Sequence, residues 1–287
     1  MATRGRTRLS REARRIINEI ARSERIHSKT IEDAFLAIVS RYGDAIDQET
    51  VLLFIASGTL PAASREFREF VNATLRPLWQ EMINVGSELA DPSYALRGLA
   101  AQSLRERHVE AWMNSRGSEL VTNFTNQQRR SINAIMEHQV RLGNSVDDMV
   151  DAMRGVVGLT ERQSLALAKM REELRASGMS PKQVLIATER KRRQMEAQRA
   201  RMIARTELSA ATNEGIISTS IAVDEELDDG LTARMFVVAY PDCCSDCRDI
   251  EDSQPADGIS LHDEWPEGWP PFHPNCRCTV DVRRIKI

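Results

Sequence analysis

All five cysteines of this 287-residue chain lie between Cys243 and Cys278, and no other pattern in the sequence restricts the fold as strongly. An odd number of cysteines in one short stretch is a poor disulfide framework for a chain of this length. The same stretch, from Pro241 onwards, holds most of the ten prolines. We therefore expect a compact, loop-rich module here, stabilised by something other than a large apolar core.

Two motifs in this module carry candidate metal ligands, Cys244-x-x-Cys247 and His273-Pro-Asn-Cys276-Arg-Cys278. A C-x-x-C turn lets both sulfur atoms face one ion, and two further ligands from a distant loop complete a tetrahedron. His273, Cys276 and Cys278 are three candidates for those two positions. Thiolates with at most one imidazole select Zn²⁺ over Mg²⁺ or Ca²⁺. The motifs therefore predict a structural zinc site.

Other interpretations of these residues stay open. A disulfide could join two of the cysteines, His273 could be a hydrogen-bonded loop residue, and Cys243 is expected to be a spectator. A catalytic metal could use His262 or Glu264, although their order is the reverse of the zinc deaminase pattern. A cysteine-rich set can close all four coordination positions, which favours a structural ion and a protein that is not an enzyme, with no catalytic residues.

The sequence before the cysteines predicts helices. Aromatic residues make up only 5% of the chain, which argues against a β-sandwich. Capping residues predict one helix after Ser10 and another from Thr30, and Gly117 predicts a kink or boundary. No stretch approaches the roughly 20 apolar residues that a membrane-spanning helix needs.

Later start signals predict helices over about 146–155, 161–177 and 181–215. Residues 234–240 form the one convincing strand of the sequence. The expected fold class is mainly α, with an elongated helical N-terminal region followed by a small α+β, loop-rich C-terminal module.

A basic stretch lies on the last of these predicted helices. The whole chain has 39 basic and 42 acidic residues, so its net charge of -3 gives no general attraction to nucleic acid or acidic membranes. Contact with packaged DNA or an acidic partner would need a local patch, and a solvated helix surface is the simpler alternative. The candidate contact residues are Arg190, Lys191, Arg192, Arg193, Arg199 and Arg201.

A second ordered series of residues spans positions 203 to 278. It consists of Ile203-Ala-Arg-Thr-Glu207, Ala211, Asn213, Gly215, Asp242, Cys244-x-x-Cys247 and Pro270-Pro-Phe-His-Pro-Asn-Cys-Arg-Cys278. This series resembles the phage Mu F-like family of minor head proteins, which act in head morphogenesis of tailed bacteriophages. The resemblance covers about residues 145 to 280, and the final His-Pro-Asn-Cys-Arg-Cys run is its most specific element.

The resemblance implies a virion component at the portal vertex or in the head interior, synthesised in the host bacterial cytoplasm. Its expected partners are the portal and capsid proteins, and its expected role is head assembly and genome packaging or delivery. A metal-dependent enzyme of head maturation and a DNA-contacting virion protein are the alternatives. On this basis we expect a virus-specific attachment region over 1–143, the helical part of the Mu F-like domain over 144–218, and the cysteine-rich module over 219–287.

The resemblance also singles out residues next to the cysteine module. Arg205 and Glu207 stand near the end of the basic helix, and Asp242 precedes the cysteines. We expect these residues to form a structural lock that joins the helix to the module. The alternative is that Arg205 and Glu207 face solvent.

Overall fold

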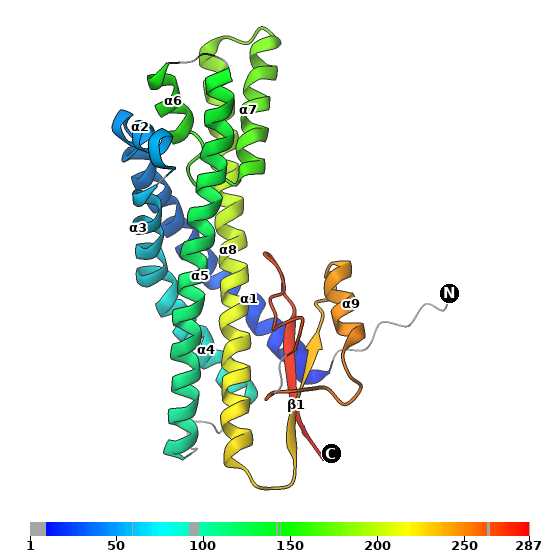
Figure 1. The fold of residues 1–287 in the computed structure, drawn as a ribbon. Helices are drawn as coiled ribbons and strands as arrows, with labels where there is room; N and C mark the ends of the chain where they lie inside the picture. The colour runs from blue at the N-terminus through cyan, green and yellow to red at the C-terminus, as the bar shows by residue number, and fades with distance from the viewer. Residues whose placement is uncertain are drawn as a thin grey trace, which may run out of the picture. The chain divides into compact units, whose positions relative to one another are not determined.

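The computed structural model describes residues 10–58, 60–91, 98–141, 143, 145–262 and 265–286. It confirms the fold class, a mainly helical chain with a small C-terminal α+β module (Figure 1). No helix in these ranges is both long enough and apolar enough to cross a membrane. In chain order the elements are α1 (Arg11–Asp44), α2 (Gln48–Ser57), α3 (Pro61–Phe70), the π-helix η1 (Val71–Leu75), α4 (Arg76–Ala90), α5 (Leu99–Arg141), α6 (Val146–Arg154), α7 (Glu161–Ala176), α8 (Pro181–Glu226), β1 (Thr232–Val238), α9 (Ser245–Ser253), β2 (Ile259–Ser260) and β3 (Thr279–Ile285).

The predicted helix starts are confirmed by side-chain caps. The hydroxyl of Ser10 accepts a hydrogen bond from the backbone N–H of Ala13. Ser145 and Thr160 each form a reciprocal capping box with the third residue of the helix that follows. These bonds satisfy N–H groups that have no partner within the helix, so they fix where α1, α6 and α7 begin.

The long helices continue through positions where the sequence predicts an interruption. Helix α1 is one helix and not two, and Gly117 is buried within the uninterrupted helix α5. A glycine inside a helix costs only about 1 kcal/mol relative to alanine, which packing of its neighbours can offset. Helix α8 runs past residue 215 to Glu226. Gly117 is therefore not a helix boundary, and the predicted end at 215 is wrong.

The chain forms two compact units. Unit 1 comprises residues 1–28, 76–114 and 202–287, and unit 2 comprises residues 29–75 and 115–201. Helices α1, α5 and α8 contribute residues to both units. The sequence-based boundaries after residues 143 and 218 stay predictions.

Unit 2 has an aromatic core. The rings of Phe67 and Phe124 stack with centroids 4.0 Å apart, and Phe35 packs edge-on against Phe124 at 6.1 Å. Aromatic rings bury large apolar areas, so a few of them can hold several helices together. Unit 2 is thus stabilised mainly by apolar packing.

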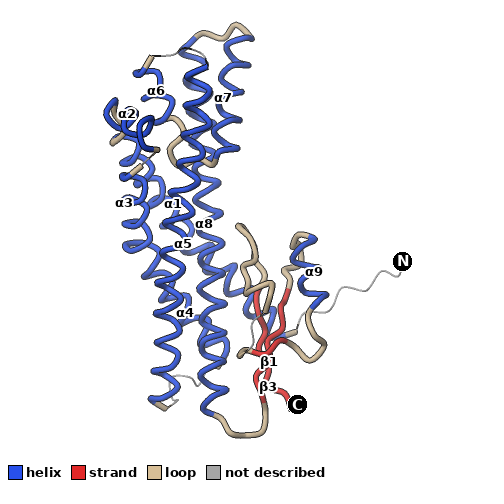
Figure 2. The backbone as a smooth tube through the Cα atoms, viewed as in Figure 1, coloured by secondary structure: helices blue, strands red, loops and turns tan. Residues whose placement is uncertain are grey.

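Unit 1 contains a three-stranded antiparallel sheet in the order β2-β1-β3 (Figure 2). Alternate residues of β1, Ala233, Met235 and Val237, are buried against Ile216 of α8 and Ile20 of α1. This period of two is what a strand with one covered face requires. Strands β2 and β3 and helix α9 were not among the sequence-based predictions, and they complete the module that carries the cysteines.

Candidate metal centre

The C-x-x-C pair lies at the start of a short helix. Cys244 is the N-cap of α9, and its Sγ accepts a hydrogen bond from the backbone N–H of Cys247. This cap geometry places both side chains at the same end of α9. The helix N-terminus also favours negative charge, and the thiolate is the form that binds metals.

The second motif forms a tight turn opposite this helix end. The backbone N–H of Cys276 donates to the carbonyl of His273, and Asn275 between them has a positive φ of 72°. Asparagine tolerates this left-handed conformation better than most residues do. The backbone N–H of Cys278 then donates to Cys276 Sγ at 3.4 Å. The turn therefore presents His273 and Cys276 on the side that faces α9.

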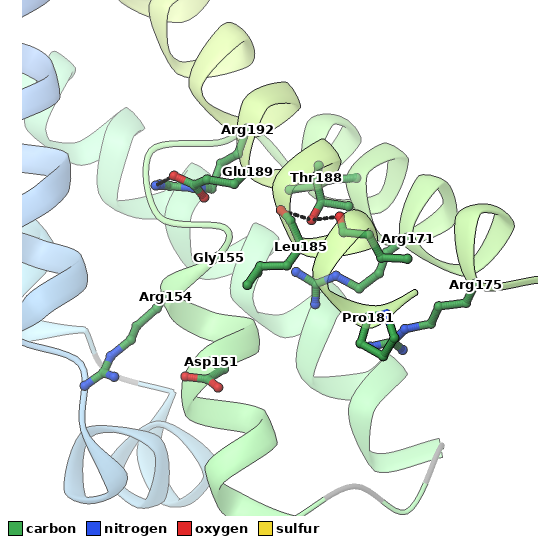
Figure 3. Close-up of a pocket in the computed structure, with 12 residues that line it drawn as sticks. Asp151, Arg154, Gly155, Arg171, Arg175, Pro181, Leu185, Thr188, Glu189 and Arg192 are labelled. Atoms are coloured by element: carbon green, nitrogen blue, oxygen red, sulfur yellow. Dashed lines mark hydrogen bonds and ion pairs between the residues drawn. The ribbon is translucent and has the colours of Figure 1, made fainter. Parts of the chain in front are cut away.

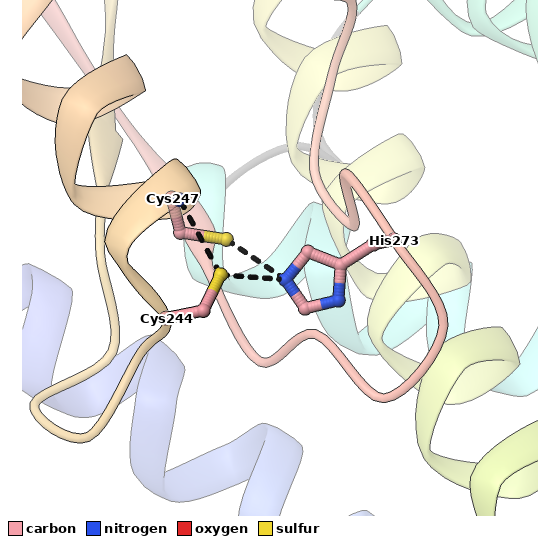
Figure 4. A group of neighbouring side chains, drawn as sticks. All are labelled: Cys244, Cys247 and His273. Carbon is pink, nitrogen blue, oxygen red and sulfur yellow. Dashed lines mark hydrogen bonds between the residues drawn. The ribbon is translucent and has the colours of Figure 1, made fainter.

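The two motifs converge on one place. His273 Nε2 lies 3.2 Å from Cys244 Sγ and 3.1 Å from Cys247 Sγ (Figure 4). Cys247 Sγ lies 3.7 Å from Cys276 Sγ. The donor atoms form two groups of three, and within each group they lie within 4.8 Å of one another. The first group is Cys244, Cys247 and His273, and the second is Cys247, Cys276 and Cys278. Cys247 is common to both groups.

Polar surroundings shift the pKa values of these thiols in different directions. Hydrogen bonds from Cys278 lower the pKa of Cys276 to about 5, although burial opposes the shift. The backbone N–H of Cys247 lowers the pKa of Cys244. The hydrogen bond to Cys276 and burial raise the pKa of Cys278, and burial is the main cause of the raised pKa of Cys247. The cluster thus stabilises some thiolates at the expense of their neighbours.

This cluster could hold a metal ion. The five donor atoms belong to Cys244, Cys247, His273, Cys276 and Cys278, and all but Cys244 and His273 are buried. The ring of His273 is oriented by a 2.9 Å contact between Nδ1 and the carbonyl of Pro274. Such a contact leaves Nε2 free to coordinate a metal. None of the five cysteines of the chain is in a disulfide.

The enzyme alternative would use His262 or Glu264, and neither is found among the metal-capable side chains of the described residues. The ring of His262 lies 3.3 Å from Asp224 Oδ2, and His262 belongs to neither group of metal-capable side chains among the described residues. Glu264 lies outside the described residues. Cys243 is half-buried and packs against the apolar side of the cysteine cluster.

Arg205 joins α8 to the loop that carries His273. One guanidinium nitrogen of Arg205 donates to Asn275 Oδ1 at 2.5 Å, and another donates to Glu24 Oε1 at 2.6 Å. Burial opposes ionisation of Glu24, but Arg205 and Arg277 outweigh it and lower the pKa of Glu24. The half-buried Arg205 is therefore part of an ionic network, which excludes the solvent-facing alternative for this residue.

Asn213 makes a second attachment, about two helical turns further along α8 than Arg205. Its amide nitrogen donates to the carbonyl of Cys278 at 3.2 Å, and its Oδ1 accepts from Thr279 Oγ1 at 2.7 Å and from Val280 N at 3.2 Å. The side chain is only 1% exposed, so these bonds form away from water. A buried amide is costly unless it is bonded, which makes this contact specific as well as strong.

The other two residues of the expected lock differ in position. Glu207 is buried in α8, so the alternative that it faces solvent is wrong. Asp242 is exposed in the turn before the cysteines and lines the same cavity as Arg205 and His273. Sequence reasoning missed Glu24, which accepts from Arg205, and gave no role to Thr206, although Thr206 stands in the series of residues 203–207. Thr206 Oγ1 accepts a hydrogen bond from the backbone N–H of Asn275. Nothing in the sequence pairs Glu24 with a residue so far away.

The basic stretch of α8 does not form one free cationic surface. Arg192 and Arg193 both pair with Glu189, and Arg201 lies 3.5 Å from Glu32. Lys191 donates to a neighbouring glutamine of the same helix. Of the candidate contact residues, Arg190 and Arg193 are exposed, as is Arg201.

Arg199 is a clear correction, because it is a core residue. It is 4% exposed, it donates to the carbonyl of Gly158 at 2.8 Å and to Gln127 Oε1 at 2.6 Å, and its guanidinium lies 5.0 Å from the ring centre of Phe124. Burial lowers its pKa to about 10. A side chain enclosed in this way cannot contact DNA or a partner surface.

Comparison of the chain with models of known protein families, with curated proteins and with solved structures gives no match. What the chain does must therefore be argued from the residues themselves.

Proposed function

We propose that this chain is a minor head protein of a tailed bacteriophage, similar in role to the Mu F-like family. In this role it is a non-enzymatic component of the virion that associates with the portal and capsid proteins. It acts in head assembly and in genome packaging or delivery.

One observation carries the proposal. The residues through which the chain resembles the family are also those that attach the cysteine module to α8. Arg205 bonds to Asn275, and Asn213 bonds to the backbone around Cys278. Gly215 belongs to the same series, and a Cβ at this position would lie 2.1 Å from the carbonyl oxygen of Ile83. A motif whose members serve packing and attachment favours a structural role over a catalytic one.

We further propose that the cluster binds one structural Zn²⁺ through Cys244, Cys247, His273 and Cys276. Sulfur atoms about 2.3 Å from a tetrahedral ion lie about 3.8 Å apart, close to the 3.7 Å between Cys247 and Cys276. His273 Nε2 lies close to the sulfurs of Cys244 and Cys247, so His273 and Cys244 are the third and fourth donors. Cys278 supports the set from outside by donating its N–H to Cys276. Four protein ligands leave no open position for a water nucleophile.

Zinc content tests this assignment. Inductively coupled plasma mass spectrometry of the purified chain should give one zinc per chain, and Cys247→Ser or Cys276→Ser should abolish stoichiometric binding. Cys243→Ser and Cys278→Ser are the matched controls and should keep one zinc. Loss of zinc in Cys278→Ser with retention in His273→Ala would overturn the ligand set. A zinc-free wild-type chain that remains folded would overturn the zinc site itself.

The virion role is tested by association. If the proposal holds, genes next to this one encode portal and major capsid proteins, and the chain co-elutes with that portal protein after co-expression. Lys182→Gln, a change at an exposed position of α8 outside the basic stretch, should leave co-elution intact. Neighbouring genes of unrelated function, together with no association, would overturn the proposal.

A further inference from the structure

A cavity in unit 2 combines several arginines from three helices. It measures about 480 Å³ and lies between the end of α6, the middle of α7 and the beginning of α8 (Figure 3). Its charged lining residues are Asp151, Arg154, Arg171, Arg175, Glu189 and Arg192. Four arginines face two carboxylates, so the lining carries an excess of two positive charges. Arg192 belongs to the expected basic stretch, but the other three arginines do not.

The four arginines differ in the partners of their guanidinium groups. Arg192 is paired with Glu189, and Arg154 Nε donates to the carbonyl of Ile46. Arg171, by contrast, makes no hydrogen bond or ion pair with any residue that the structure describes. Burial and then the neighbouring charge of Arg175 lower the pKa of Arg171, while Asp151 acts in the opposite direction.

Arg171 and Arg175 are one turn apart on α7, so their side chains lie on the same face of that helix. Figure 3 shows both guanidinium groups extending toward the segment of α8 that carries Pro181 and Leu185. Arg171 is half-buried and Arg175 is exposed, so Arg171 bears both a desolvation cost and the repulsion of the neighbouring positive charge. An anion between them would remove both penalties.

We propose that this cavity binds inorganic phosphate or a phosphate monoester, with Arg171 and Arg175 as its main ligands. A phosphate monoester carries a charge of about -1.5 to -2 at neutral pH, which matches the excess charge of the lining. Its three terminal oxygens can engage two guanidinium groups at once, whereas a single guanidinium satisfies both oxygens of a carboxylate. The concave shape and the two carboxylates disfavour the convex backbone of duplex DNA.

Isothermal titration calorimetry with inorganic phosphate, at an ionic strength held constant with chloride, tests the site. The full-length chain should bind one phosphate saturably, and Arg171→Gln should weaken binding about tenfold or more, as expected when a charge-assisted contact is lost. Arg175→Gln is a second variant at an exposed side chain and should weaken binding in the same direction. Arg162→Gln is the matched control, since Arg162 is exposed on the same helix and does not line the cavity.

The source of the phosphate is identified by two further titrations, with a single-stranded oligonucleotide that carries a 5′-phosphate and with the same oligonucleotide without it. Preference for the phosphorylated form supports recognition of a nucleic-acid end, and binding of inorganic phosphate alone supports a free anion. Heats that do not saturate, or equal weakening by Arg171→Gln and Arg162→Gln, would overturn the proposal. The proposal would also be overturned if both oligonucleotides bound equally well and Arg171→Gln did not weaken their binding.

Discussion

The core of unit 2 and the cysteine module achieve burial by different means. In unit 2, stacked and edge-on phenylalanine rings surround even a buried cation, Arg199, which is 5.0 Å from the ring centre of Phe124. In the module, the sheet buries aliphatic residues against α1 and α8, but the cluster around the thiols consists of Ala239, Cys247, Cys276 and Cys278, with no large aliphatic side chain among them. The apolar area buried near the thiols is therefore small, and the hydrophobic contribution to stability is roughly proportional to that area.

This difference indicates what each region needs in order to stay folded. Packing of large rings tolerates single polar insertions, provided that each polar atom is bonded. A small cluster of thiols gains little from burial, so we expect its stability to depend on the proposed metal ion and on the polar attachments made by Arg205 and Asn213. Loss of one such bond should affect the module without changing unit 2.

Metal removal should have the largest effect. Structural zinc sites in small peptides contribute on the order of 10 kcal/mol or more, so chelation should unfold the region around the thiols and loosen the strands next to it. Hydrogen–deuterium exchange should rise in β1, α9 and β3 while α7 in unit 2 stays protected. Unchanged exchange in all four elements after complete metal removal would show that the thiols do not depend on an ion.

Truncation of Phe124 should have the next largest effect, and in the other region. Phe124 is 5% exposed and contacts three aromatic or cationic side chains, so Phe124→Ala should lower the free energy of unfolding by about 3–5 kcal/mol. Zinc stoichiometry should not change. Phe236→Ala on β1 is the matched control, because that ring is only half-buried and should cost about 1 kcal/mol. Similar losses for both variants in urea denaturation would contradict the contrast between the regions.

The sequence predicted the helical region well and the module only in part. Helix starts could be predicted because a capping side chain is adjacent to the N–H groups that it satisfies, as at Ser145 and Thr160. The proximity of the two cysteine motifs could be anticipated from ligand chemistry. The burial of Arg199 could not, because its partners Gly158 and Gln127 are distant in sequence and an arginine ordinarily lies at the surface.

Strand β3 had a visible alternation, with Val280 and Val282 between polar residues, but it follows directly on the last cysteine and is short. The predicted strand at 234–240 was found two residues earlier, at Thr232–Val238. Asn213 was recognisable as part of a motif, yet its bonds to Cys278 and Val280 depend on how α8 meets the sheet. Tertiary contacts of this kind leave no local pattern.

Asn213→Ala should have an intermediate effect and should be specific to unit 1. The change leaves buried partners such as Val280 N–H and Cys278 C=O without a hydrogen bond, at a cost of about 2–3 kcal/mol. Asn126→Ala on α5 is the control, because its amide oxygen accepts from the exposed Arg129 and the change should cost less than about 0.5 kcal/mol. Thermal denaturation followed by circular dichroism gives the comparison. Equal midpoints for the two variants would remove Asn213 from the attachment of the module.

The smallest expected effect concerns two carboxylates of unit 2 that share Arg192. Burial raises the pKa of Glu196 to about 7, although Arg192 opposes the shift, whereas the hydrogen bond from Arg192 lowers the pKa of Glu189 to about 2. The ordinary value for both is 4.5. Between pH 4.5 and 7 the unfolded chain has therefore released a proton that folded Glu196 still holds.

The stability that Glu196 contributes is present below about pH 4.5 and is lost as the pH rises to about 7, a change on the order of 2 kcal/mol relative to Glu196→Gln. Glu189→Gln is the control with the opposite sign, because the contribution of Glu189 is present above pH 4.5 and lost as the pH falls toward 2. Urea denaturation of the wild type and both variants at about pH 3, 4.5, 6 and 7.5 measures these differences. If the gap between wild type and Glu196→Gln does not move across this range, unit 2 does not bury a titrating carboxyl, and its stability rests on apolar packing more completely than the structure indicates.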